Sequence, residues 1–306
     1  MGDPSGVGPE VALKALASPK VKGLADFLLI GDLFVIDKAR REMRLRLNAP
    51  VLDVANVSDL FFSYGDPTPA NGRASIEYLD KALDILKMGK ANGLVTAPVN
   101  KSAVKASGLK DFQGHTEYLA VRTGVKDYAM MFVGPKLKVT LVTRHVALKR
   151  VPESITVDAV YKAIFLTHKY LKEFFKVRHP RIGVAGLNPH AGELGAFGDE
   201  EIKVIAPAIK KALRNFKNIT GPLPADVLFY DALNGKFDAA VAMYHDQALP
   251  AFKMLYFKDG VNLTLGLPFI RTSPDHGTAF NIAGKGIADP GSMIEAIRLA
   301  CRLSKC

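Results

Sequence analysis

Three histidines stand directly behind apolar runs that look like buried strands. His145 follows KVTLVTR, His190 follows RIGVAGLNP and His245 follows AAVAMY. In an open α/β sheet the carboxyl ends of the strands meet at one edge, where ligands bind. Three imidazoles that converge there could hold one divalent metal and leave positions for a substrate. A single histidine after a strand is more often a satisfied polar residue, so only the repetition makes the metal interpretation as strong as the structural one.

Two turns supply further polar groups. The segment GHTE, residues 114–117, opens a predicted helix whose first N–H groups could receive an anion. Thr116 could equally serve there as an ordinary N-cap. The segment TAPVNK, residues 96–101, leads from a strand into a helix and ends on Lys101, which either reaches the same edge of the sheet or lies in solvent. Neither turn decides the chemistry alone.

The longest polar segment is punctuated by glycine and enters an amphipathic helix. It reads DHGTAFNIAGKGIADP and spans residues 275–290. This segment resembles the adenosine-binding loop of the isopropylmalate and isocitrate dehydrogenase superfamily, which binds nicotinamide cofactors without a Rossmann fingerprint. In that pattern an acidic residue commonly stands at the position of Asn281 and bonds the ribose hydroxyls. An amide does not repel a 2′-phosphate as a carboxylate does, so the sequence allows either NAD or NADP as the cofactor.

Further motifs extend the resemblance from residue 2 to about residue 300. In chain order they are GDPSGVGPE, TAPVNK, GHTEYLA, GLNPHAGE, GPLPAD, MYHDQALP, VNLTLGLPFIRTS and DHGTA. Together they closely resemble the 4-hydroxythreonine-4-phosphate dehydrogenase family of vitamin B6 biosynthesis. The sequence therefore predicts an enzyme, although members of this family also oxidise other four-carbon acid phosphates.

The resemblance implies a role for each matching residue. One divalent metal (Zn, Mg or Co) would be held by His145, His190 and His245. The substrate ligands would be His115, Thr116, Asp226, Lys253, Asn262 and Arg271. The cofactor would be bound by His276, Gly277, Thr278, Ala279, Asn281 and Asp289. The general base stays open among Lys101, Asp226 and Asp246.

The implied reaction is the oxidation of 4-(phosphooxy)-L-threonine to a 3-keto acid, which loses carbon dioxide to give 3-amino-2-oxopropyl phosphate.

Two positions depart from the family pattern: Arg144 stands where a small polar residue is common, and Val227 stands where threonine is common. Arg144 adds a positive charge beside the expected metal and could change the substrate preference. The alternatives are a dehydrogenase of D-threonate or D-erythronate 4-phosphate and, more remotely, a phosphate acyltransferase, which has a related fold and uses no nicotinamide.

Short apolar runs alternate with longer amphipathic segments along the chain. The runs predict strands at 27–31, 93–97, 130–133, 137–143, 181–187, 239–244 and 261–265. The amphipathic segments predict helices at 9–18, 32–44, 74–90, 116–123, 155–177, 199–216 and 290–303. Because most runs are continuously apolar, as in strands buried on both faces, we expect an α/β fold with a largely parallel sheet.

The resemblance also implies two α/β/α domains of the isopropylmalate/isocitrate dehydrogenase type, with the active site in a cleft between them. Residues 1–113 and 254–306 would form a discontinuous cofactor-binding domain, and residues 114–253 a domain for metal, substrate and dimerisation. The family forms homodimers whose active site takes residues from both subunits. The initial loop GDPSGVGPE would normally follow a strand, so either that strand is absent or it precedes Met1.

Composition sets outer limits on function. The chain has 306 residues, with 41 Lys+Arg against 30 Asp+Glu and a formal net charge of +11. Its basic residues are scattered and not interleaved with aromatic residues, which argues against a nucleic-acid partner. Its two cysteines, at positions 301 and 306, exclude a disulfide framework and favour a cytoplasmic location. No apolar run reaches the roughly 20 residues that span a bilayer, so no membrane association is expected.

Overall fold

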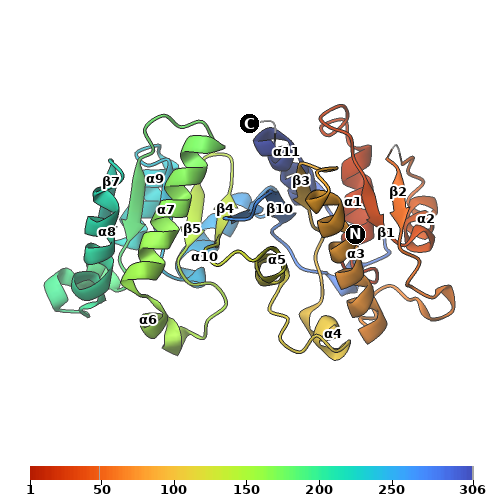
Figure 1. Ribbon diagram of the computed structural model, residues 1–306, viewed down its shortest axis with the longest axis horizontal. Helices are drawn as coiled ribbons and strands as arrows, with labels where there is room; N and C mark the ends of the chain where they lie inside the picture. The colour runs from red at the N-terminus through yellow and green to blue at the C-terminus, as the bar shows by residue number, and fades with distance from the viewer. Residues whose placement is uncertain (48, 305–306) are drawn as a thin grey trace. The chain divides into compact units, whose positions relative to one another are not determined.

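Two units, each combining strands with helices, make up the chain in the computed structural model (Figure 1). The structure describes residues 1–47 and 49–304, so the cysteine at position 306 and the end of the predicted 254–306 segment lie outside it. What we call the N-terminal unit comprises the described residues among 1–124, 258–261 and 268–304. The central unit comprises residues 125–257 and 262–267.

The central unit is built on strands in the order β9-β4-β5-β8-β6-β7. Their bounds are β4 Ala129–Val133, β5 Lys138–Leu141, β6 Ile182–Ala185, β7 Ile219–Leu223, β8 Ala239–Ala242 and β9 Val261–Leu265. Strand β4 runs antiparallel to β5, whereas β5, β8, β6 and β7 pair in parallel. The sheet is therefore mixed, although the pairs β5–β8, β8–β6 and β6–β7 run in parallel as expected. The four residues between β4 and β5 are far too few for the crossover that a parallel neighbour needs.

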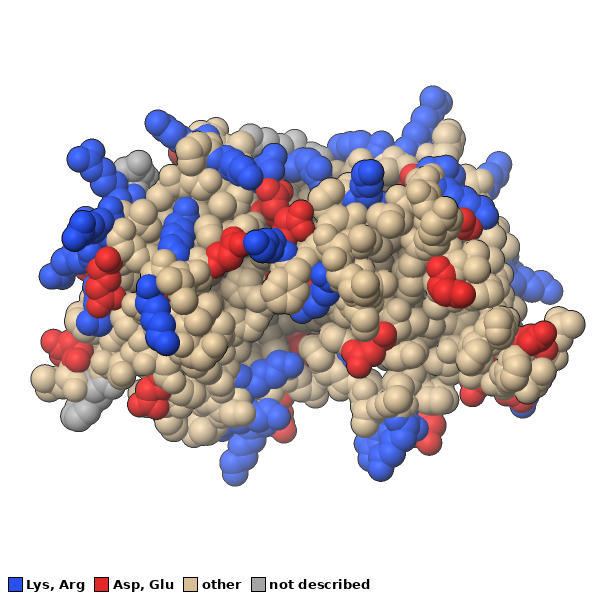
Figure 2. All heavy atoms as spheres, turned by 180° about the vertical axis from the view of Figure 1, so that it is seen from behind, with Lys and Arg blue, Asp and Glu red and all other residues tan. Residues whose placement is uncertain are grey.

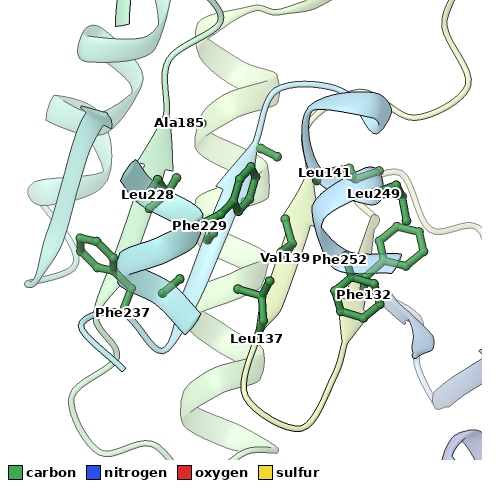
Figure 3. Packing of buried hydrophobic residues seen from close by; sticks show 14 of the residues in the cluster. Phe132, Leu137, Val139, Leu141, Ala185, Leu228, Phe229, Phe237, Leu249 and Phe252 are labelled. Carbon is green, nitrogen blue, oxygen red and sulfur yellow. The ribbon is translucent and has the colours of Figure 1, made fainter. Parts of the chain in front are cut away.

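Both faces of this sheet are buried, and strand β8 shows how. Its even-numbered residues Ala240 and Ala242 pack in a cluster with helices α9 (Ala225–Leu233) and α10 (His245–Tyr256). Ala239 and Val241 pack in a second cluster with α7 (Val157–Glu173) and α8 (Ala206–Leu213). Successive side chains of a strand point to opposite faces, so a strand covered on both sides must be apolar throughout. Figure 3 shows part of the first cluster, with Phe252 of α10 beside Phe132 of β4.

The helices of the central unit vary in regularity. Their bounds are α6 Val151–Ser154, α7 Val157–Glu173, α8 Ala206–Leu213, α9 Ala225–Leu233 and α10 His245–Tyr256. Short 3₁₀ turns occupy Leu148–Arg150 and part of Pro189–Gly195. The helix predicted at 199–216 is divided into a π-helical turn, Glu201–Ile205, and α8, in which Pro207 stands at the second position. Proline has no N–H to donate, so it marks the start of the regular helix.

The N-terminal unit pairs β1 with β2 and β3 with β10, both in parallel. Its strands are β1 Leu29–Gly31, β2 Val51–Asp53, β3 Gly93–Val95 and β10 Ile270–Pro274. Its helices are α1 Gly8–Ala17, α2 Leu33–Glu42, α3 Pro69–Lys87, α4 Lys101–Ala106, α5 His115–Thr123 and α11 Gly291–Ser304, with 3₁₀ turns at Asp59–Phe61 and Phe280–Ile282. Residues of α1 and α11 meet in one apolar cluster, so segments from the two ends of the chain build this unit together.

A cavity of about 720 Å³ in the N-terminal unit is lined by residues of β1 and β3. The amino group of Met1 lies at its wall and donates a hydrogen bond to the carbonyl of Ile30, 2.9 Å away. Burial lowers the pKa of that amino group to about 5.

Charged residues of both signs share the surface. Figure 2 shows Lys and Arg distributed over one face with Asp and Glu among them. Lys162, for example, is within 2.8 Å of carboxylate oxygens of both Asp127 and Asp158. Within residues 1–47 and 49–304, no helix combines the length and the apolar character that a membrane span requires.

Candidate functional site

A buried arginine organises the polar cluster of the N-terminal unit. Arg271, in β10, is 3% exposed, and its guanidinium donates to the hydroxyl of Thr96 at 2.6 Å and to that of Thr116 at 3.5 Å. Strand β10 pairs with β3, and the N–H of Thr96 just beyond β3 still bonds Thr272, so the sheet itself sets the first contact. Thr116 reaches the guanidinium from the first turn of α5. A buried charge must be hydrogen-bonded to be tolerated, and these hydroxyls provide that.

The electrostatics of this cluster suit an anion. Burial lowers the pKa of Arg271 to about 10, with Glu117 acting in the opposite direction, so the guanidinium is charged at neutral pH. Burial, together with the charges of Arg271 and Lys101, holds the pKa of His115 well below its ordinary value. A neutral imidazole therefore stands beside a buried cation at the start of a helix, where N–H groups also point outward. This arrangement can bind a phosphate or a carboxylate.

Lys101 belongs to the same cluster. Asn100 caps α4, its side chain accepting the N–H of Ala103 at 2.7 Å, so Lys101 begins the helix and is exposed. The lysine side chain extends toward Gly114, because a Cβ built on that glycine would lie 3.8 Å from the lysine nitrogen. The N-cap of α5 is Gly114, which corrects the alternative that Thr116 serves as a cap. The sequence named the TAPVNK turn but not Thr96 as the partner of Arg271.

The glycine-punctuated loop of residues 275–289 places the predicted cofactor residues on one segment. His276 contacts the carbonyl of Gly277 through Nδ1 at 2.9 Å, and its Nε2 is buried with no hydrogen-bond partner in the described part of the chain. The carbonyl of Thr278 accepts the N–H of Val7, and Ala279 adopts a left-handed conformation beside it. Asn281 is exposed.

Asp289 has a second role at the end of that loop. Its carboxylate accepts the N–H of Gly291 at 2.8 Å, at the point where α11 begins. Short side chains that bond the backbone two residues onward are typical of helix starts. The structure thus gives Asp289 a local function, and its predicted contact with a cofactor stays a prediction.

Two of the three predicted metal ligands approach each other in the central unit. The rings of His145 and His245 have centroids 6.0 Å apart. Strands β5 and β8 pair in parallel, so the residues that follow their carboxyl ends emerge at the same edge. His245 is the first residue of α10, and its Nδ1 lies 2.6 Å from a carboxylate oxygen of Asp246. Such a carboxylate fixes which ring nitrogen remains available to a metal.

His190 lies on a turn of unusual backbone geometry. Residues 190–194 all have positive φ, including 53° at His190 and 56° at Leu194, which is left-handed conformation in residues that rarely adopt it. His190 is exposed and its ring lies 6.1 Å from that of Phe197. Among the residues that the structure describes, no three His, Cys, Asp or Glu side chains form a group that could hold a metal ion. The structure thus brings together His145 and His245 without His190.

A buried glutamate anchors the segment that leads to His190. Glu201 is 3% exposed, and one of its carboxylate oxygens accepts the N–H groups of Leu187 and Asn188, each at 2.7 Å. The other oxygen accepts the side-chain amide of Asn188 at 2.9 Å. The carboxylate therefore fixes the chain just beyond β6 and two residues before His190. The sequence motif did not reveal Glu201, because its contacts depend on the fold of the following π-helical turn.

The remaining predicted substrate residues lie on separate elements of the central unit. Asp226 is exposed in the first turn of α9, and Lys253 is half-buried in the last turn of α10. Asn262 is in β9, and its side-chain oxygen is buried with no donor within the described segments. Arg144 stacks on the ring of Tyr128, with the guanidinium carbon 4.6 Å from the ring centroid. The aromatic ring thus gives this departure from the family pattern a defined position.

Comparison with known proteins defines the class. The family model described as "Pyridoxal phosphate biosynthetic protein PdxA" matches residues 21–300. A 4-hydroxythreonine-4-phosphate dehydrogenase from Desulfosudis oleivorans is 47% identical, with 100% of this chain and 95% of the relative covered. A protein from Oceanobacillus iheyensis, 42% identical over 99% of this chain and 96% of its own length, is named for D-threonate 4-phosphate dehydrogenase activity.

The solved structures agree with the sequence comparison. The crystal structure of 4-hydroxythreonine-4-phosphate dehydrogenase from Klebsiella pneumoniae superposes with a TM-score of 0.87 at 35% identity, covering 99% of this chain and 98% of that one. Fold and sequence together define a dehydrogenase. The chain belongs to the PdxA family of pyridoxal phosphate biosynthetic proteins, the 4-hydroxythreonine-4-phosphate dehydrogenases, and the resemblance found in the motifs is confirmed.

Proposed function

We propose that the chain oxidises 4-(phosphooxy)-L-threonine with NAD or NADP, and that the keto acid formed loses carbon dioxide to give 3-amino-2-oxopropyl phosphate. The observation that supports the proposal is the cluster of Arg271, His115 and Thr116, a buried cation and polar groups that can bind an anion, in a chain of this family. The proposed substrate carries two anionic groups, a phosphate and a carboxylate. A buried guanidinium with fixed partners can bind either one in a bidentate manner.

The chain's own residues would divide the recognition of the substrate. Arg271, with His115 and Thr116, supplies a planar fork and a neutral imidazole, while Lys253 supplies a point charge. Asn262 adds a buried amide oxygen that could accept a hydrogen bond from the substrate. Asp226, exposed on α9, could meet the amino group of the substrate. Each of these groups has a chemical counterpart on a four-carbon amino acid phosphate.

One divalent metal, Zn, Mg or Co, belongs to this proposal. His145 and His245 fit it in kind, since neutral imidazoles at the end of neighbouring strands are common ligands of such ions. His190 would complete the set once residues 190–194 take up another conformation. When bound, the metal would act as a Lewis acid that lowers the pKa of the substrate alcohol.

The contacts of the three candidate residues narrow the choice of the base that removes the alcohol proton. Asp246 bonds the ring of His245, which suits an orienting role. Asp226 is exposed in α9, whereas Lys101 lies beside His115 and the anion cluster. We therefore propose Lys101 as the first candidate for the base. Its replacement by methionine should lower kcat at saturating substrate and cofactor.

The cofactor and the assembly follow the family. The loop 275–289 would bind the adenosine half of NAD or NADP, and Asn281 would accept either cofactor because it carries no charge.

We also propose a cytoplasmic homodimer with a shared active site. Mixing two variants that are inactive for different reasons should restore part of the activity if the site is shared.

A substrate panel tests the function directly. The protein would be assayed with 4-(phosphooxy)-L-threonine, D-threonate 4-phosphate and D-erythronate 4-phosphate, each with NAD and NADP, and reduced cofactor and carbon dioxide would be measured. We expect kcat/KM for the amino acid substrate to exceed the others by about tenfold or more, a difference of about 1.4 kcal/mol in transition-state binding. Preference for either amine-free acid would favour the second function instead. That alternative is supported by the Oceanobacillus relative and by Arg144.

A further inference from the structure

An ion pair on helix α1 holds the backbone of the proposed cofactor loop. Glu10 and Lys14 lie one turn apart on α1, and Lys14 Nζ is 2.8 Å from the Glu10 carboxylate. The carboxylate accepts the N–H of Ala288 at 2.8 Å and that of Gly286 at 3.3 Å. Lys14 donates to the carbonyls of the same two residues, each at 2.8 Å. One charged pair thus satisfies both donors and both acceptors of these two loop residues.

The loop depends on such contacts because it has no regular structure from residue 283 to residue 290. Backbone groups outside helices and sheets need partners of their own, and charge-assisted hydrogen bonds are the stronger kind. Glu10 is 3% exposed, so water competes little for its carboxylate. A neighbouring contact adds to the restraint, since Gly284 has a φ of 73° and a Cβ there would overlap the ring of Tyr64.

The same helix start reaches the loop at a second point. Val7, the residue before α1, donates its N–H to the carbonyl of Thr278 at 2.9 Å. One helix and the residue before it thereby hold the loop near both of its ends, and each contact is made to the main chain of the loop. Its exposed residues, Asn281, Lys285 and Ile287 among them, keep their side chains available for a ligand.

We propose that Glu10 and Lys14 are positioning residues for the nicotinamide cofactor, and this inference rests on the proposed function. Neither residue needs to touch the cofactor. Their pair keeps residues 286–288 in the conformation that binds the adenosine half, and the apparent affinity for the cofactor falls in proportion to the time the loop spends elsewhere. Substrate held by Arg271 would bind independently of this pair.

The test compares Lys14→Met with Lys14→Arg. The first variant keeps most of the aliphatic stem and removes the charge and all three donor contacts, whereas the second retains a cation with several donors. For Lys14→Met we expect the KM for NAD and the Kd for NADH, measured by fluorescence, to rise about tenfold, as expected if the loop is competent about one-tenth of the time. The KM for the phosphorylated substrate and kcat at saturating cofactor should change less than twofold. Lys14→Arg should restore most of the affinity.

A matched control and a second variant complete the design. Lys162 also pairs with an acidic residue one turn away on its helix, so Lys162→Met should leave both KM values unchanged. Glu10→Gln removes the charge from the other partner and should raise the Kd for NADH in the same direction, which covers the case in which Lys14→Met does not fold. Faster amide hydrogen exchange of residues 284–290 in the variants would add support.

Two results would overturn the inference in different ways. If wild-type protein binds NADH and both variants bind it equally well, the positioning role is wrong and the proposed function stands. The same holds if the two KM values rise together. If wild-type protein binds neither NADH nor NADPH, the cofactor of the proposed function is wrong, and the positioning role fails with it.

Discussion

The two units present their candidate catalytic groups in opposite ways. In the N-terminal unit, Arg271 is already bonded to Thr96 and Thr116 inside the fold. In the central unit, His145 and His245 approach each other while His190 stays on an exposed turn. A buried cation without fixed partners would destabilise the folded protein, so its site must be assembled before any ligand arrives. Exposed imidazoles do not have this desolvation cost, so their site can be ordered when the ligand binds.

Each unit nevertheless uses a buried glutamate to fix the backbone of a functional loop. Glu10 joins Lys14 in holding residues near the end of the loop 275–289. Glu201 accepts hydrogen bonds from Leu187 and Asn188, at the base of the turn that carries His190. The difference lies in what remains unrestrained. The first loop is held by α1 near both of its ends, whereas Glu201 holds the second at its start, ahead of the left-handed residues 190–194.

The largest effect in this comparison should come from the preassembled site. Arg271→Met removes a charge-assisted contact worth about 1.5–3 kcal/mol, so the KM for 4-(phosphooxy)-L-threonine should rise about 10- to 150-fold. The variant also relieves a buried charge, so the midpoint of thermal unfolding need not fall. Steady-state kinetics with saturating cofactor would measure the change. An unaltered KM would remove Arg271 from the substrate site.

A smaller effect is expected when the base of the histidine turn is released. Glu201→Ala leaves the N–H groups of Leu187 and Asn188 without their acceptor, and support of this kind typically accounts for about 10- to 100-fold in metal affinity. We expect a change near the lower value, about tenfold, in a Zn²⁺ titration followed by calorimetry. Glu200→Ala is the control, because Glu200 accepts a hydrogen bond from the side chain of Asn188 and not from its backbone N–H, which bonds Glu201. Equal metal affinity in both variants would mean that the turn needs no anchor.

The exposed carboxylate beside His245 should matter less. Asp246 is 79% exposed, so its bond to the imidazole competes with water. Asp246→Asn should weaken Zn²⁺ binding by less than about tenfold, at the low end of the range for residues that orient a ligand. A loss as large as that of His245→Ala in the same titration would show that Asp246 is itself a ligand.

The smallest effect concerns pH and stability. His115 has a pKa well below its ordinary value of 6.5 because of burial and the charge of Arg271, so the unfolded chain binds a proton that the folded chain excludes. Stability should therefore be complete above pH 6.5 and fall as the pH drops below it. Urea unfolding at pH 7.5 and pH 5.5 should show this loss in wild-type protein and a smaller loss in His115→Asn. Replacement of the exposed His179 by asparagine should not reduce the loss.

The sequence predicted most of the elements that bury apolar side chains. Continuous apolar runs in the sequence form β4, β5, β6 and β8, and an apolar face is evident in α7. These patterns can be recognised without a structure. Strands β7 and β10 were missed, since ITGPL and IRTSP mix polar residues and proline with few apolar ones. Helices α9 and α10 were missed because they begin immediately behind strand or turn residues, and α10 contains Pro250.

The residues of the candidate site could be predicted only where they lie in a motif of the family. Arg271, His115 and Thr116 came from family motifs, and the structure brings them together. The partners that hold them in place were not predictable, because Thr96 bonds Arg271 across 175 positions and Glu10 bonds Ala288 across 278. Such contacts depend on which elements become neighbours, and no local spacing encodes that. The left-handed turn at His190 is equally invisible in PHAGELG.

One measurement tests the central claim most directly, namely that three histidines of the central unit hold a single divalent metal in an active dehydrogenase. Protein stripped with a chelator would be titrated with Zn²⁺ by calorimetry, as wild type and as His190→Ala, with turnover of 4-(phosphooxy)-L-threonine recorded on the same samples. We predict one Zn²⁺ per chain in wild type, and in His190→Ala a loss of tight binding and of turnover while thermal unfolding stays cooperative. Full metal content together with full activity in His190→Ala would contradict the account.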